Sequence, residues 1–191
     1  MYRRKLSHLY SHFNRRRKLR FLSGLISRHQ LTSGLIVGAK PRSDSSEFDN
    51  LIERGLVQIL PTLVVSGIEA ESTSWQDWVQ ADALSLPFED SSFDLVFSNA
   101  VIEHVGNEIE QIKFVNEHNR VGKNWVLTTP NRLFPIESHT QKLFIHMSRG
   151  WMHGDVTRLL SKRDLRKILP PDAKIKGYWF SPTFLCYRIA D

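Results

Sequence analysis

Short apolar runs alternate along this chain with segments of helical periodicity, and this alternation limits the folds open to it. Strand-like runs lie at 34–39, 62–70, 79–84, 93–100 and 124–130. Helical segments lie at 45–56, 107–121 and 161–169, and the chain closes on a β pair at 173–180 and 183–190. Because parallel neighbours need a long crossover, usually a helix, this order predicts an α/β protein with a mostly parallel sheet between two layers of helices.

Two of the predicted helices begin at capping residues. Asn107 opens the segment 107–121 and Glu110 follows three residues later, which is an asparagine variant of the capping box. Ser161 opens the segment 161–169 in the same way. Both starts are therefore predicted from local chemistry alone.

The charge of the chain is unevenly distributed. Residues 1–43 hold 11 Lys and Arg and no acid, whereas the remainder holds 15 basic and 20 acidic residues. We therefore expect a basic amphipathic helical leader at 1–33 and a single, mildly acidic domain at 34–191. The high isoelectric point comes from the leader, so it does not indicate that the whole protein binds nucleic acid.

Cysteine usage and hydropathy indicate the compartment. The single cysteine, Cys186, excludes an internal disulfide framework and a cysteine-based zinc cluster, and no structural metal is expected. No apolar run approaches the roughly 20 residues that span a bilayer. The sequence therefore predicts a soluble, cytoplasmic protein, with peripheral attachment to a membrane left open.

The leader admits three interpretations. Its apolar residues recur at helical spacing: Leu6, Leu9, Tyr10, Phe13, Leu19, Leu22, Leu25 and Ile26. Such a helix can pack on the domain with its charged face in solvent. Alternatively, residues 1–30 can dock on anionic lipid or nucleic acid, or act as an Arg-rich targeting segment.

Polar residues follow the predicted strands at the positions where a ligand is expected. In a doubly wound sheet, ligands bind beyond the carboxyl ends of the strands, near the point where the strand order reverses. Gly38 follows the first strand, Glu69 ends the second and Asp82 ends the third. Carboxylates at these positions suit the hydroxyl donors of a ribose and the amino donor of an adenine.

The segment ADALSLPFEDSSFDLVFSNAVIEHVGN, 81–107, resembles the core of class I S-adenosylmethionine-dependent methyltransferases of the type 11-like group. The shared pattern is an acid followed by a small residue, an apolar-Pro-Phe turn, FDLV, a small polar step and EHV, and NEHNRVGKNWVLTTPNRLFP continues it at 116–135. The resemblance covers about 34–191. It implies a Rossmann-like, three-layer α/β/α fold with seven strands, of which the last runs antiparallel.

The resemblance also implies the cofactor, S-adenosyl-L-methionine. The ribose acid of the family falls on Glu69 and the adenine acid on Asp82, and the methionine end should lie near Asn99. The cofactor-binding positions expected on this basis are Gly38, Ala39, Lys40, Glu69, Ala70, Asp82, Ala83, Leu84, Ser98, Asn99 and Ala100.

The glycine loop departs from the family pattern. Ile36, Lys40 and Arg42 stand where members have an acid and two further glycines, and only Gly38 remains. The cofactor has no pyrophosphate, so close backbone approach is the remaining demand, which Gly38 and Ala39 can meet. A cation 4 Å from a sulfonium is repelled by roughly 4 kcal/mol, so Lys40 and Arg42 should face solvent or pair with the cofactor's carboxylate. Loss of cofactor binding is the alternative that this loop leaves open.

Methyl transfer needs an aligned acceptor and, where the acceptor must lose a proton, a base. His139 is the first candidate and His104 the second, followed by Glu137 and His153. The sequence therefore predicts an S-adenosylmethionine-dependent methyltransferase that acts on a small-molecule, lipid-linked or glycan acceptor. Two alternatives stay open: a degenerate fold acting as a binding or scaffold protein, and a nucleic-acid-associated methyltransferase. The lack of an Asn/Asp-Pro-Pro-aromatic motif counts against the second.

Overall fold

The structure is a computed structural model that describes residues 2–39, 51–70, 75, 77–136, 142–147 and 154–190, with side chains of the first helix from His12 onward. The helices are α1 (Tyr2–His29), α2 (Leu51–Ile59), α3 (Glu108–Val121) and α4 (Lys162–Ile168), with a short 3-10 helix η1 (Ile145–Met147). The strands are β1 (Ser33–Val37), β2 (Thr62–Gly67), β3 (Trp78–Gln80), β4 (Phe93–Asn99), β5 (Gly122–Pro130), β6 (Lys174–Lys176) and β7 (Thr183–Arg188).

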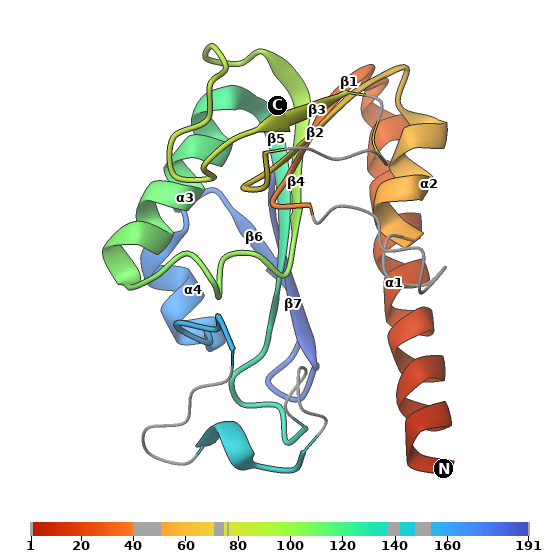
Figure 1. Cartoon of the computed structure of the whole chain (residues 1–191), viewed down its shortest axis with the longest axis vertical. Helices are drawn as coiled ribbons and strands as arrows, with labels where there is room; N and C mark the ends of the chain where they lie inside the picture. Colours follow the sequence, from red (N-terminus) through yellow and green to blue (C-terminus); the bar gives the residue numbers. More distant parts are fainter. Residues whose placement is uncertain are drawn as a thin grey trace.

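The seven strands form one sheet in the order β3-β2-β1-β4-β5-β7-β6. Strands β1 to β5 pair in parallel, while β7 runs antiparallel to both β5 and β6. Helices α1 and α2 cover one face of this sheet and α3 and α4 the other (Figure 1). The predicted Rossmann-like, three-layer α/β/α fold with an antiparallel last strand is thus confirmed.

Each central strand supplies apolar side chains to both faces, because successive residues of a strand point to opposite sides. In β1, Leu35 and Val37 belong to the core beneath α3 and α4, whereas Ile36 belongs to the core beneath α1 and α2. In β4, Val96 packs toward α3 and Phe97 toward α1. The continuous apolar runs of the sequence are therefore strands buried on both sides.

The basic leader forms one continuous helix, α1, and its carboxyl-terminal half is part of the core. Leu22, Leu25 and Ile26 are buried between α2 and the sheet. Leu19 lies so close to Gly55 of α2 that a Cβ at Gly55 would stand 2.5 Å from the Leu19 Cδ2 atom. From Lys18 to Ile26, this helix packs on the domain, as the first interpretation of the leader expects.

The local cap signals are confirmed. The Asn107 side chain accepts a hydrogen bond from the Ile109 amide, while Glu110 accepts one from the Asn107 amide. Ser161 and Asp164 make the equivalent pair of bonds at the start of α4. Both helices start one residue after the predicted cap.

Two predicted elements differ in extent. The strand expected at 173–180 ends at Lys176, because Gly177 adopts a left-handed φ of +127° and turns the chain away from the sheet. The helix expected at 45–56 is seen as α2 from Leu51 to Ile59, and residues 45–50 lie outside the described residues.

Candidate functional site

The strand order reverses between β1 and β4, whose carboxyl ends lie side by side. Val37 pairs with Ser98, so Gly38 and Asn99 follow at neighbouring positions on this edge. Gly38 has a left-handed φ of +74°, and a Cβ there would stand 2.7 Å from both γ-carbons of Val101. Only glycine fits this turn, and it brings the backbone after β1 directly against the backbone after β4.

The next residue continues this close contact between backbones. Ala39 is buried, and its amide donates to the Ser66 carbonyl of β2 at 2.9 Å. A Cβ at Gly67 would stand 2.5 Å from the Ala39 carbonyl oxygen and 2.4 Å from the Trp78 ring. Lys40 and Arg42, the cations expected to matter here, lie outside the described residues.

Two exposed carboxylates follow the next two strands of the same edge. Glu69 and Ala70 are exposed directly after β2. Asp82 is exposed after β3, and its Oδ1 accepts a hydrogen bond from the Leu84 amide at 2.8 Å, which orders the Asp82–Leu84 turn around Ala83. Because β2 and β3 are parallel neighbours, both carboxylates lie at the carboxyl edge that also carries Gly38 and Asn99.

Ser98, Asn99 and Ala100, at the carboxyl end of β4, take different roles. Ser98 is buried, and its hydroxyl lies 3.0 Å from His118 Nε2 in α3. His118 Nδ1 bonds the Phe114 carbonyl, so Nδ1 carries the proton and Nε2 accepts from Ser98; burial lowers the pKa of His118 to about 4. The Ser98 side chain therefore supports the strand from within and only its backbone is available at the edge.

Ala100 is held in an unusual conformation. Its φ is +58°, in the left-handed region that disfavours a residue with a Cβ, and its amide donates to the Thr128 carbonyl at 2.9 Å. Strain of this kind is concentrated at functional sites, where the surrounding structure holds it in place. Ser98, Asn99 and Ala100 are thus brought together with Gly38 as expected.

A lysine from α1 enters this site. Lys18 is only 8% exposed, and its Nζ donates to Asn99 Oδ1 at 3.0 Å and to Thr128 Oγ1 at 3.1 Å. Thr128 Oγ1 itself donates to Asn99 Oδ1 at 2.7 Å. The carboxyl ends of β4 and β5 are therefore joined to the middle of α1 through one buried ammonium group.

Two buried carboxylates balance the charge of Lys18. Burial lowers the pKa of Lys18 to about 8, although Glu103 and Glu53 act in the opposite direction. Burial raises the pKa of Glu53, and within the described part of the chain its Oε2 has no hydrogen-bond partner. Glu103 Oε2 accepts a hydrogen bond from Thr129 Oγ1 at 3.1 Å. The groups form a compact, desolvated network directly behind Asn99.

Sequence reasoning missed Lys18 and Glu53. Lys18 precedes Leu22 by four residues and Leu25 by seven, so it stands on the apolar stripe of its helix. A cation on an apolar stripe indicates a buried charge with a partner. Because arginines surround Lys18 in the sequence, its place on the stripe is not evident from the charge count alone.

Of the predicted bases, only His104 lies within the described residues. It is half-buried after β4, and its Nδ1 lies 3.2 Å from Asp155 Oδ1. A carboxylate at this distance can orient the imidazole. His139, Glu137 and His153 lie outside the described residues.

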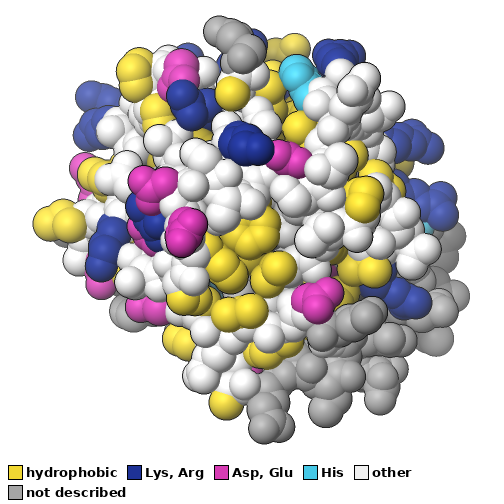
Figure 2. All heavy atoms as spheres, turned by 90° about the horizontal axis from the view of Figure 1, so that it is seen from above, with side chains coloured by type: hydrophobic (Ala, Val, Ile, Leu, Met, Phe, Trp, Pro, Cys, Tyr) yellow, Lys and Arg dark blue, Asp and Glu magenta, His cyan; other side chains and the backbone are white. Residues whose placement is uncertain are grey.

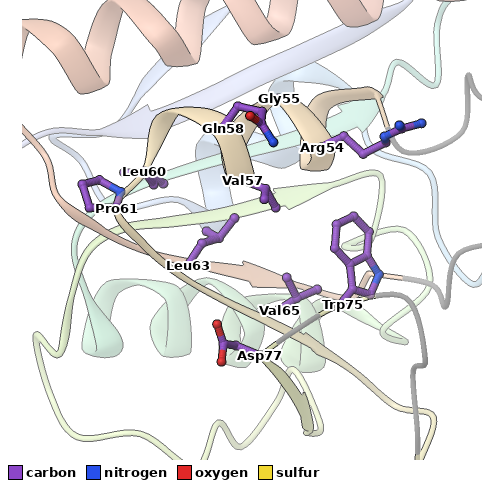
Figure 3. Close-up of a pocket in the computed structure, with 10 residues that line it drawn as sticks. All are labelled: Arg54, Gly55, Val57, Gln58, Leu60, Pro61, Leu63, Val65, Trp75 and Asp77. Carbon is purple, nitrogen blue, oxygen red and sulfur yellow. The ribbon is translucent and has the colours of Figure 1, made fainter.

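A separate groove of about 700 Å³ lies between α2 and β2, with Trp75 at its side (Figure 3). It lies along the amino-terminal half of β2, so it is distinct from the carboxyl-edge site. Among the residues that the structure describes, no three His, Cys, Asp or Glu side chains are gathered so as to hold a metal ion. No helix in the described ranges is long and apolar enough to cross a membrane.

Comparison with known proteins relates this arrangement to one family. The sequence model of the methyltransferase domain family matches residues 61–125. A curated protein of Encephalitozoon cuniculi, named provisionally as a methyltransferase, is 41% identical over 56 residues, which is 29% of this chain and 27% of that protein. The match thus spans about a quarter of the curated relative.

Solved structures show the same fold. Magnesium protoporphyrin IX methyltransferase from Synechocystis, determined with bound S-adenosylhomocysteine, is similar with a TM-score of 0.58 and 10% identity, covering 90% of this chain and 81% of that one. A SAM-dependent methyltransferase from Aquifex aeolicus gives a TM-score of 0.55 and 12% identity, with 86% of each chain covered.

Proposed function

Because this chain has the class I S-adenosylmethionine-dependent methyltransferase fold, we propose that it is a methyltransferase that uses S-adenosyl-L-methionine. The observation that carries the proposal is the position of Glu69 and Asp82, two exposed carboxylates on successive strands beside Gly38 and Asn99. The proposed acceptor is a small molecule or a lipid-linked or glycan group.

The residues at the carboxyl edge suit the parts of this cofactor. Glu69 would accept from the ribose hydroxyls, and Asp82 from the adenine amino group, with backbone groups of Ala83 and Leu84 beside it. Gly38 and Ala39 bring the backbone after β1 close to the neighbouring strand ends, and such a close approach is what this cofactor would require of the turn. Asn99 and the strained Ala100 are the proposed neighbours of the methionine end.

The cofactor supplies an electrophilic methyl group on a good leaving group, so the chain has to align the acceptor and handle one proton at most. His104 is the proposed base among the described residues, since Asp155 holds its ring. Lys18, Glu53 and Glu103 hold Asn99 from behind rather than reaching the reacting atoms.

A thermal-shift comparison tests the proposal on the full chain. S-Adenosylmethionine and S-adenosylhomocysteine should each raise the unfolding temperature, because a ligand that binds only the folded state stabilises it by mass action. ATP and NAD at the same concentration, which require a pyrophosphate or triphosphate site, should not. Stabilisation by neither sulfur compound would overturn the proposal and favour a degenerate fold that acts as a binding protein.

A further inference from the structure

Seven large apolar side chains are exposed on three loops at one end of the molecule. Tyr178 and Trp179 are each 71% exposed in the turn between β6 and β7. Phe180 lies in the same turn, and the others follow β5 or precede η1. The full set is Leu133, Ile136, Leu143, Phe144, Tyr178, Trp179 and Phe180. We call this set of side chains and the loops that carry them the loop face.

Hydrogen bonds tie the three loops into one surface. Asn131 is buried, and its Nδ2 donates to the Trp179 carbonyl at 2.7 Å and to the Ser181 carbonyl at 2.8 Å. Ile136 bridges to Leu143, and the Phe144 amide donates to the Pro135 carbonyl at 2.7 Å. The exposed apolar side chains are therefore presented by a connected scaffold rather than by independent loops.

The described part of the loop face is cationic. Arg132, Lys142 and Lys176 are exposed on it, and its described segments 131–136, 142–147 and 176–182 contain no Asp or Glu, although Glu137 follows Ile136 in the sequence. The opposite end of the molecule shows Lys and Arg interspersed with Asp and Glu (Figure 2).

The basic helix α1 reaches the same end. Asn14 Nδ2 donates to Thr183 Oγ1 at 3.3 Å, and Lys176 Nζ lies 4.5 Å above the Phe21 ring, so α1 runs beside the β6–β7 turn. At a rise of 1.5 Å per residue, the part of α1 before Asn14 extends about 18 Å further. Figure 1 shows its amino terminus at the lower end, where the loops after β5, η1 and the β6–β7 turn also lie.

We propose that the loop face and the amino-terminal part of α1 dock on an anionic phospholipid bilayer. Lysine and arginine are attracted to anionic headgroups, while Trp, Tyr and aliphatic side chains gain by entering the interface between headgroups and acyl chains. A nucleic acid would satisfy the cations but offers nothing to Leu133, Ile136 and Leu143. The combination of cations with exposed aliphatic groups therefore favours lipid.

Docking in this orientation also bears on the acceptor, a step that rests on the proposed function. Asn99 ends β4 beside Thr128 of β5, and β5 runs on to Pro130 toward the loop face, as its course in Figure 1 shows. The carboxyl-edge site would then open toward the bilayer surface. This orientation selects the lipid-linked class among the proposed acceptors.

Co-sedimentation of the full chain with vesicles tests the docking surface. We expect binding to phosphatidylcholine vesicles that contain phosphatidylglycerol, little binding to phosphatidylcholine alone, and weakening by salt. The double variant Trp179→Ser/Phe180→Ser should bind about tenfold or more weakly, as should Leu143→Ser/Phe144→Ser. Arg16→Glu/Arg17→Glu, at exposed positions of α1, should weaken binding by a similar factor or more.

Ile109→Ser is the matched control, since Ile109 is 78% exposed on α3 and lies off the loop face. It should bind as the unaltered chain does, and circular dichroism of each variant should confirm that it folds. Failure to bind the anionic vesicles, or binding that both apolar double variants leave unchanged, would overturn the proposal. The proposal would also be overturned if the loop-face variants weakened binding to a single-stranded oligonucleotide but left binding to vesicles unchanged. S-Adenosylhomocysteine binding in solution is measured separately, so failure of docking and failure of the proposed activity are distinguishable.

Discussion

Lys18 Nζ lies 3.0 Å from Asn99 Oδ1, so the middle of the first helix is bonded to the residue that ends β4. The two residues are 81 positions apart in the chain. A segment that reads as a detachable basic leader thus reaches the edge of the sheet where the cofactor is proposed to bind. Removing α1 would expose the core around Leu22 and also remove a support of Asn99.

Replacement of Lys18 should separate stability from function. The pKa of Lys18 is lowered to about 8 even with Glu103 and Glu53 nearby, so burial of the charged ammonium group costs folding stability at pH 7. Lys18→Met keeps the apolar stem and removes this cost, but it leaves Glu53 and Glu103 buried without the ammonium group. The two effects oppose each other, so the free energy of unfolding should change by less than about 2 kcal/mol. Affinity for S-adenosylhomocysteine should fall, because Asn99 loses a partner.

Urea unfolding and calorimetry measure the two effects, with Arg20→Met on the exposed side of α1 as the control that changes neither. A Lys18→Met variant that is less stable by about 3 kcal/mol or more would show that the ammonium group stabilises the fold, contrary to this account.

The same lysine predicts a pH dependence. Its pKa falls from 10.5 in the unfolded chain to about 8 in the folded one, so between these values the unfolded state binds more protons. Stability of the unaltered chain should therefore rise with pH across this window, by on the order of 3 kcal/mol relative to Lys18→Met. Urea unfolding of both proteins between pH 7.5 and 10 measures the difference. A constant difference across this range would contradict the burial of Lys18.

Gly38→Ala should destabilise the chain by about 2 kcal/mol or more, because the left-handed φ and the clash with Val101 both oppose a Cβ. Adding Val101→Ala should relieve the clash but not the backbone strain. The effects of the two substitutions on the free energy of unfolding should therefore be non-additive by about 1 kcal/mol. Gly24→Ala in α1, where a Cβ meets nothing within 4 Å, is the control and should stabilise slightly. Strict additivity of Gly38→Ala and Val101→Ala would show that the turn does not approach Val101.

Asp94 should account for part of the loss of folding stability at acidic pH. Its carboxylate bonds Lys123 Nζ, the Thr32 amide and hydroxyl and the Ser33 amide, and these bonds hold its pKa well below the usual range. A depressed pKa contributes stability above the unfolded value of 3.8, and this contribution is lost as pH falls through and below it. Asp94→Asn should therefore be less stable at pH 7, with a smaller fall toward pH 3. An equally steep acid transition in this variant would contradict the assignment.

The parts of the fold that could be predicted rest on local chemistry. Asn107 and Glu110 signal a helix start within four residues, and the continuous apolar run of β4 signals a strand buried on both faces. Residues 178–180 illustrate the limit of such signals. Tyr178, Trp179 and Phe180 have high strand propensity, yet Gly177 turns the chain and leaves them exposed.

The candidate site was predictable only where it follows the order of the strands. Gly38, Glu69 and Asp82 follow a strand within two residues and Asn99 ends one, and parallel pairing brings such positions to one edge. Lys18 reaches the same edge through tertiary contacts with partners 81 and 110 residues away, which no local pattern encodes. Its position on the apolar stripe of α1 was the one local sign.

Calorimetric titration of S-adenosylhomocysteine into the full chain and into Asp82→Asn and Glu69→Gln variants tests the central claim most directly. The unaltered chain should bind one equivalent, and each variant should bind roughly 10-fold to 100-fold more weakly, since each loses a charged acceptor of a hydrogen bond. Glu89→Gln, another exposed acid, is the matched control and should bind normally. No binding by the unaltered chain, or equal binding by all four proteins, would contradict a cofactor site at this edge of the sheet.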